Sequence, residues 1–125
     1  MQIKAIDHLV IPVSDIKKAL HFYVDILNMK LDTGSNRYAV TFGTQKINLH
    51  VGLAEFSPAA QKPAFGSTDL CFLVEGDLQD IKEEIESKGI HIEEGIIERQ
   101  GAQGPMESIY LRDPDGNLIE LSTLI

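Results

Sequence analysis

The stretch DPDGNLIE, residues 113–120, decides how the C-terminal half of this 125-residue chain is expected to fold. Asp-Pro-Asp-Gly at 113–116 gives a strong tight-turn signal, because Pro presets one backbone angle and Gly accepts a positive one. The apolar residues on either side of the turn predict two antiparallel strands, 108–111 and 118–121. Glu120 lies at the end of this stretch, on the polar face of the second strand.

The elements expected before this hairpin follow an order that occurs twice. Each copy begins with an apolar strand, continues with a helix whose apolar residues recur at three- and four-residue spacing, and ends with short strands. The strands are expected at 3–13, 30–32, 38–42 and 46–51 in the first copy and at 68–74, 91–96, 108–111 and 118–121 in the second. Ser14 or Asp15 is the expected cap of the first helix, and Asp77 is the expected cap of the second.

Residues 53–66 lack periodicity and contain two prolines, so we expect them to link the two copies. The first copy is then module one, 1–52, and the second is module two, 67–125. A chain of 125 residues is long enough for one ordinary domain and too short for two independent ones. The sequence therefore predicts a single domain, 1–125, of the α+β class.

Composition narrows the partners and the location that we expect. The formal charge of −8 disfavours binding to nucleic acid or to anionic membranes, since both repel an acidic protein. No apolar run approaches the roughly 18 residues of a membrane span, and the N-terminus does not resemble a signal peptide. The single cysteine, Cys71, cannot form an internal disulfide and is expected to be buried. A small-molecule partner and a cytoplasmic location fit these observations.

Aligning the two copies places His8 over Asp69 on the first strands and His50 over Glu120 on the last strands. The extra residues of the second copy then fall in 99–105, which is rich in glycine. A flap beside a binding site and a floppy surface loop are equally open interpretations of that segment.

Each of the four aligned residues lies on a strand whose opposite face is wholly apolar. Two carboxylates and two neutral imidazoles balance the charge of one divalent ion, and this mixed N/O set suits Zn, Ni, Fe, Co or Mn. The alternatives are separate roles, with His8 and His50 as core or edge residues, Asp69 as a turn cap and Glu120 as a surface charge. Their common register favours a shared metal site.

The sequence also resembles a known family. The stretches that carry the resemblance are Asp-His-Leu-Val at 7–10, Phe-Tyr at 22–23, Asn-Leu-His at 48–50, Ser-Ile-Tyr at 108–110 and the stretch 113–120. They are similar to the vicinal oxygen chelate superfamily, which includes glyoxalases, bleomycin-resistance proteins and extradiol dioxygenases. Short glyoxalase-domain proteins, including virulence-associated bacterial ones, are the most similar in kind. The resemblance covers essentially the whole chain.

This resemblance implies two βαβββ modules whose curved, mixed sheets form an open cup around a metal, and it implies a homodimer. The family's metal ligands fall on His8, His50, Asp69 and Glu120 of this sequence. The family chemistry is Lewis-acid catalysis, in which the metal stabilises an enolate or oxyanion.

The expected function is a metal-dependent lyase or isomerase that acts on a small oxygenated metabolite. Glu120 or His50 is the expected catalytic base, and Asn48, Arg99 and Arg112 are the expected substrate contacts, with Arg37 a weaker choice. The alternatives are a non-catalytic binding protein of the bleomycin-resistance type and a dioxygenase of the same superfamily. Pro12 stands where glyoxalase I has a glutathione-binding Arg, so the resemblance implies a different substrate.

Overall fold

The computed structural model describes residues 1–34 and 36–125. They form two compact units, Met1–Phe65 and Gly66–Ile125, which are called unit one and unit two below. Unit one contains β1 (His8–Val13), α1 (Ile16–Leu20), η1 (His21–Ile26), β2 (Lys30–Asp32), β3 (Tyr38–Phe42) and β4 (Gln45–Val51). Unit two contains β5 (Asp69–Leu73), α2 (Leu78–Ser87), β6 (Glu94–Gly101), β7 (Gly104–Arg112) and β8 (Leu118–Leu124). The prediction of one domain spanning both units stays a prediction.

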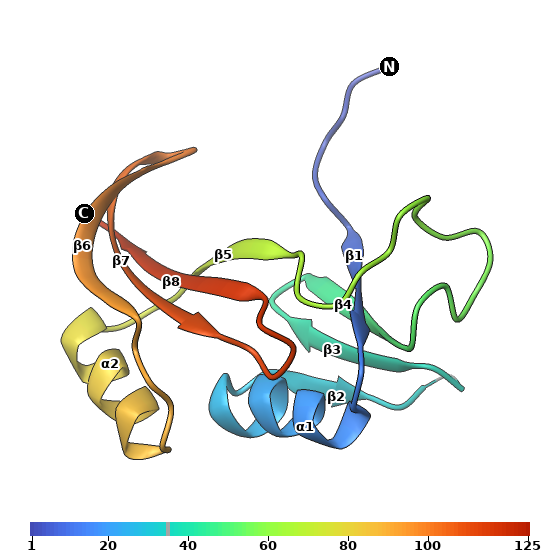
Figure 1. Cartoon of the computed structure of the whole chain (residues 1–125). Helices are drawn as coiled ribbons and strands as arrows, with labels where there is room; N and C mark the ends of the chain where they lie inside the picture. Colours follow the sequence, from blue (N-terminus) through green and yellow to red (C-terminus); the bar gives the residue numbers. More distant parts are fainter. Residues whose placement is uncertain (35) are drawn as a thin grey trace. The chain divides into compact units, whose positions relative to one another are not determined.

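Each unit is built on a four-stranded mixed sheet (Figure 1). The strand order is β1-β4-β3-β2 in unit one and β5-β8-β7-β6 in unit two, so the same topology occurs twice. In both sheets the first strand runs parallel to the last one, and the remaining neighbours are antiparallel. The α+β class and the strand–helix–strands repeat are confirmed. None of the described helices is long and apolar enough to cross a membrane.

The helix in each unit begins at an aspartate, as the sequence predicts. The Asp15 carboxylate accepts a hydrogen bond from the Lys18 backbone N–H at 3.1 Å, and the Asp77 carboxylate accepts one from the Asp80 N–H at 3.0 Å. Each bond satisfies one of the N–H groups that a helix start leaves without a partner. Of the two caps considered for the first helix, Asp15 rather than Ser14 is the N-cap.

The first helix changes from an α-helix to a π-helix after residue 20. Residues His21–Ile26 form a π-helix, and the Leu27 N–H donates to the Phe22 carbonyl, five residues earlier, at 2.9 Å. The wider turn shifts the buried stripe, so Phe22 and Ile26 are almost fully buried. The 3.6-residue period predicts Val24 in the core instead, and this residue is only half-buried.

The strands divide their side chains between two faces in both units. The buried positions alternate along the strands and are almost wholly apolar, and they include Ile11, Val13, Ile47, Leu49, Ile109, Leu111, Ile119 and Leu121. In unit two the helix α2 contacts β7 and contributes buried Leu78 and Ile85 to this core. The polar residues expected at a site lie on the opposite, open face of each sheet, as the alternation predicts.

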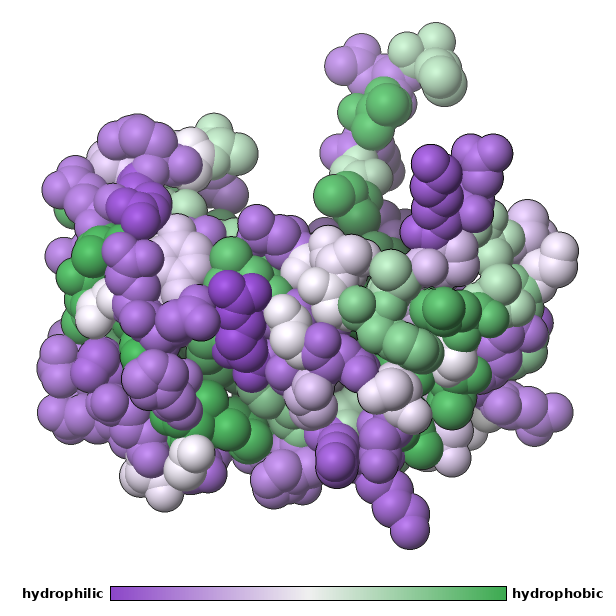
Figure 2. Space-filling model, viewed as in Figure 1, coloured by the Kyte–Doolittle hydropathy of each residue, from purple (hydrophilic) through white to green (hydrophobic). Residues whose placement is uncertain are grey.

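The first strand is shorter than predicted. β1 begins at His8 rather than at residue 3, because its neighbour β4 begins at Gln45 and offers no further backbone to pair with. The Gln45 side-chain amide donates to the Ile6 carbonyl at 3.1 Å. Residues 1–7 are all exposed, and Figure 2 shows this segment carrying hydrophobic residues into solvent.

The segment 99–105 is not the loop that the sequence predicts. It belongs to a long hairpin in which Gly101 pairs with Gly104, so that only Ala102 and Gln103 form the turn. Gly104 has a φ of 130°, which suits glycine and allows so tight a connection. The expected strand 91–96 therefore begins and ends too early, and the expected strand 108–111 is confirmed within the longer β7.

The turn after β7 is held by one buried carboxylate and one buried amide. Asp113 Oδ1 accepts hydrogen bonds from the N–H groups of Asp115 and Asn117, at 3.0 and 2.9 Å. The Asn117 amide nitrogen donates to Asp113 Oδ2 at 2.7 Å, and its oxygen accepts from the Thr68 N–H at 2.8 Å. Asn117 therefore ties the residue before β5 to the residue before β8, and it sets these two strands side by side.

We expect Asn117→Ala to lower the free energy of unfolding by about 2–4 kcal/mol, because it removes the hydrogen bonds that its side chain makes to buried Asp113 and to the partly buried N–H of Thr68. Chemical denaturation monitored by circular dichroism measures this change. The matched control is Asn36→Ala, at an exposed position, which should stay within about 0.5 kcal/mol of the parent chain. A loss for Asn117→Ala no larger than that of the control would contradict the role of this amide.

Candidate functional site

Glu120 occupies the middle of the open face of unit two. It lies on β8, opposite Cys71 on the parallel strand β5 and opposite Tyr110 on the antiparallel strand β7. Residues directly opposite each other on neighbouring strands project to the same face. The open face therefore brings a carboxylate, a thiol and a phenol together.

Two buried serines hold one oxygen of this carboxylate. The Ser108 hydroxyl donates to Glu120 Oε2 at 2.6 Å, and the Ser122 hydroxyl donates to the same oxygen at 3.2 Å. The two hydroxyl oxygens are 2.7 Å apart, and neither serine is exposed to solvent. Both hydroxyls thus lie against Oε2, and Cys71 also interacts with the Glu120 carboxylate.

The thiol of Cys71 joins the same group. Its sulfur lies 3.2 Å from the Ser122 hydroxyl oxygen. Partial burial raises the pKa of Cys71, the hydrogen bond to Ser122 lowers it, and the negative charge of Glu120 raises it again, so that the balance is a raised pKa. The residue as a whole is exposed, so the prediction of a buried cysteine is wrong. Its place on an edge strand explains the difference.

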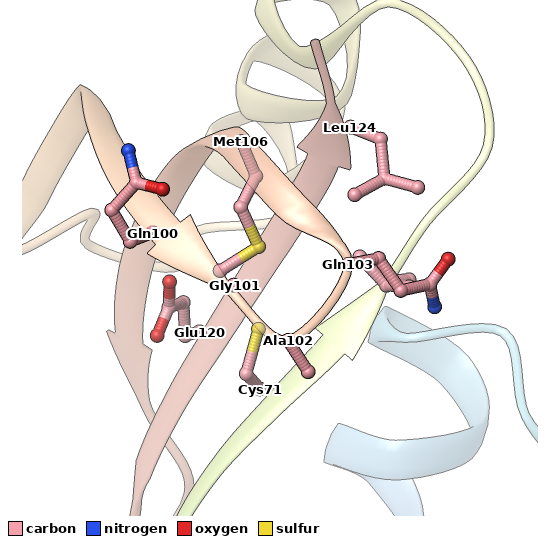
Figure 3. A pocket seen from close by; sticks show the side chains of 9 residues that line it. Cys71, Gln100, Gly101, Ala102, Gln103, Met106, Glu120 and Leu124 are labelled. Atoms are coloured by element: carbon pink, nitrogen blue, oxygen red, sulfur yellow. The ribbon is translucent and has the colours of Figure 1, made fainter.

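A pocket of about 390 Å³ opens over this group. It is lined by Cys71, Leu73, Gln100, Gly101, Ala102, Gln103, Met106, Glu120 and Leu124. Figure 3 shows that the β6–β7 turn forms one wall and that the side chains of Cys71, Met106 and Glu120 come from three different strands to line the cavity. The glycine-rich segment 99–105 is thus a pocket wall made of paired strands.

The two arginines expected to bind substrate do not line this pocket. Arg99 donates from Nε to the Tyr110 hydroxyl at 3.0 Å, and one of its terminal nitrogens lies 3.8 Å from the Glu94 carboxylate. Arg112 forms a two-point ion pair with Glu93, with N–O distances of 3.0 and 3.3 Å. Both guanidinium groups therefore have local partners in unit two, and their role in substrate binding stays a prediction.

Strand pairing also shows which residues of the two units correspond. In unit one His8 pairs with Lys46 across β1 and β4, and in unit two Asp69 pairs with Leu118 across β5 and β8. When His8 is placed on Asp69, Lys46 consequently falls on Leu118.

It follows that Asn48, two residues after Lys46, corresponds to Glu120, and that His50 corresponds to Ser122. The predicted alignment of His50 with Glu120 is wrong by two residues. The alternation of faces has a period of two, so a shift of two residues leaves every polar residue on its face and is invisible to the sequence pattern.

The two histidines of unit one have different surroundings. His8 is well exposed, and its Nδ1 lies 2.8 Å from the Asp7 carboxylate, which leaves Nε2 for another partner. His50 is buried, and its ring packs edge to face on Phe56 with the ring centres 5.0 Å apart. The Arg37 guanidinium covers the same Phe56 ring at 3.7 Å. A carboxylate on one ring nitrogen is typical of a metal-binding histidine, and His8 has this arrangement.

Strand geometry tests how well each predicted pair of ligands fits one metal ion. Two ligands of one transition metal have donor atoms no more than about 4.5 Å apart. Asp69 and Glu120 are offset by two register positions, or about 7 Å along the strands, which two carboxylate side chains can span. His8 and His50 are offset by four positions, about 13 Å, so this pair fits one ion poorly.

No group of three or more His, Cys, Asp or Glu side chains in residues 1–34 and 36–125 is assembled to hold a metal ion. Each unit supplies two of the four residues predicted as ligands. Their convergence on one metal stays a prediction.

The sequence pattern did not identify three residues that contact Glu120 or His50. Ser108 and Ser122 hold Glu120, and the alternation of faces was the available signal, since Ser122 shares the face of Glu120. Phe56 lies in the segment expected to be a linker, where no periodicity pointed to a contact with His50.

Comparison with known proteins identifies the family. The family model of the Glyoxalase/Bleomycin resistance protein/Dioxygenase superfamily matches residues 5–121. The chain therefore belongs to this superfamily, as its resemblance implied.

Three relatives illustrate the range of names in the family. The Salmonella typhimurium (strain LT2) virulence protein STM3117 is 50% identical over all of this chain and 88% of that protein. Its crystal structure matches with a TM-score of 0.97 and covers all of both chains. The glyoxalase domain-containing protein RDO1 of Mycosarcoma maydis is 44% identical, over 98% of this chain and 70% of that protein. The metallothiol transferase FosB of Staphylococcus saprophyticus is 30% identical, over 97% of this chain and 78% of that protein.

Alkylation kinetics test the electrostatic contact between Glu120 and Cys71. Because the carboxylate raises the pKa of the thiol, Glu120→Gln is expected to lower that pKa and to speed alkylation by roughly threefold at mildly alkaline pH. The rate of reaction with iodoacetamide as a function of pH measures the effect at this single cysteine. Glu107→Gln removes a charge at an exposed position of β7 and serves as the control. Equal rate profiles for the two variants would refute the contact.

Proposed function

We propose that this chain is a metal-dependent lyase or isomerase that acts on a small oxygenated metabolite. The observation that carries the proposal is the carboxylate of Glu120, which faces a pocket while two buried serines hold its far oxygen. Membership of the superfamily supports it, and so does the 30% identity to a protein named as a metallothiol transferase. We propose further that the protein works in the cytoplasm as a homodimer.

The proposed metal is Zn, Ni, Fe or Mn. Asp69 and Glu120 are its proposed ligands in unit two, and His8 is the proposed nitrogen ligand from unit one. His50, expected from the sequence, and Asn48, which corresponds to Glu120 in the repeat, are the two candidates for a fourth ligand. When bound, such an ion supplies Lewis acidity to a substrate oxygen.

The residues of unit two have defined tasks in this proposal. Ser108 and Ser122 hold Glu120 Oε2, which leaves the other oxygen as the proposed ligand atom. The proposed base for the proton transfer is the same carboxylate when it is released from the ion. The wall formed by the β6–β7 turn limits access of water to that proton transfer.

A second candidate function is binding without catalysis, as in a resistance protein that sequesters a small molecule. The lining of the pocket favours binding without catalysis, because most of its side chains are apolar or amide and only one is a carboxylate. Such a lining is typical of small-molecule sites whether or not a reaction follows.

Metal titration of chelator-treated protein distinguishes the two functions. We expect the parent chain to bind one Co²⁺ ion per site, with a visible absorption band, and Glu120→Gln, Asp69→Asn and His8→Ala each to weaken binding at least about tenfold. The same titration of Asn48→Ala and His50→Ala identifies the fourth ligand, because only the variant that lacks a ligand should lose affinity.

Glu107→Gln is the matched control, since it removes the same charge away from Glu120 and should bind Co²⁺ like the parent chain. Failure of the parent chain to bind any of Zn, Ni, Fe, Co or Mn would exclude the enzyme and leave the binding protein. Equal affinities for all variants would show that the metal is held elsewhere.

A further inference from the structure

The charges around the pocket of unit two restrict its ligand. None of the nine side chains that line this pocket is a Lys, Arg or His, and Glu120 is the one carboxylate among them. Arg99 and Arg112, the cations considered for substrate binding, are paired with carboxylates of β6 or of the segment before it. In the metal-free pocket, an anionic group would meet a negative carboxylate and no lining cation, in a chain whose formal charge is −8.

The end of the pocket away from Glu120 is apolar. Leu73 on β5 and Leu124 on β8 are both about half-exposed, at 50% and 48%, and Met106 on β7 is buried. These three side chains lie beside the β6–β7 hairpin, where Gln100 of β6 and Gln103 of the turn contribute neutral amides. Exposed leucines in a concave site gain free energy when an apolar group covers them, whereas a charged group placed there loses its hydration.

We propose that the ligand of unit two is an uncharged molecule with an oxygenated head and a short apolar tail. The head lies at Glu120, and the tail lies between Leu73, Met106 and Leu124. This inference rests on the proposed function only for the position of the head. It names the substrate class, and it excludes substrates whose tail carries a carboxylate or a phosphate.

The test uses three probes with the same head, a 1-hydroxy-2-ketone, and a four-carbon tail that ends in a methyl, a carboxylate or an ammonium group. Binding is measured on metal-free, ¹⁵N-labelled protein from amide chemical shifts, so the result does not depend on metal uptake or turnover. We expect the methyl probe to shift the amides of Gln100 to Gln103 and to bind about tenfold more tightly than either charged probe.

A charge placed at the tail end should invert this preference. Leu73→Lys puts an ammonium beside the apolar end of the pocket. Because Leu73 is half-exposed, the lysine can reach solvent and the variant is expected to fold. We expect this variant to bind the carboxylate probe about tenfold more tightly than the parent chain does. Leu31→Lys, on β2 of unit one with a leucine 41% exposed, adds the same charge elsewhere and should leave all three affinities unchanged.

Each outcome decides a different claim. Tighter binding of the carboxylate or ammonium probe by the parent chain overturns the proposed ligand class, and so does the absence of shifts at Gln100 to Gln103 with the methyl probe at its solubility limit. Preference for the methyl probe without turnover in metal-loaded protein supports the ligand class and removes only the proposed catalysis. Metal binding with no preference among the probes overturns the proposed ligand class and leaves the proposed metal site standing.

Discussion

The hydrogen bonds of the buried Asn117 side chain are the constraint on which unit two depends. Its amide nitrogen binds Asp113, which closes the turn after β7, and its oxygen binds the backbone of Thr68, just before β5. One side chain therefore joins three strands at the same end of the sheet. Because β5 and β8 start together, Cys71 lies opposite Glu120, and the thiol and the carboxylate face the same pocket.

A carboxylate on a sheet face is costly unless it has partners. Glu120 obtains them from two serines that are themselves fully buried. The same charge influences its neighbour, since it contributes to the raised pKa of Cys71. Buried serines on the same face of the sheet thus position the carboxylate of Glu120.

The two units share a topology but use it differently. At the place where unit two has Ser122, unit one has His50, which packs against Phe56 from the segment after β4. Asn48 stands where unit two has Glu120. The two units thus share their backbone pairing, but unit two has an acidic face with a pocket, and in unit one Phe56 packs on His50 and Arg37 covers Phe56.

The sequence by itself determined the strand–helix–strands repeat, the aspartate caps, the turn at 113–117 and the placement of Glu120 on the open face. These features follow from local signals: hydrophobic period, capping chemistry and turn residues. Only the tertiary structure decided the register between β1 and β4 and between β5 and β8, and with it the match of Glu120 to Asn48 rather than to His50. Alternation along a strand has a period of two, so it cannot detect a shift of two residues. The hydrogen bonds of the two serines to Glu120 and the turn that forms a wall of the pocket likewise depend on contacts between strands, which local patterns do not record.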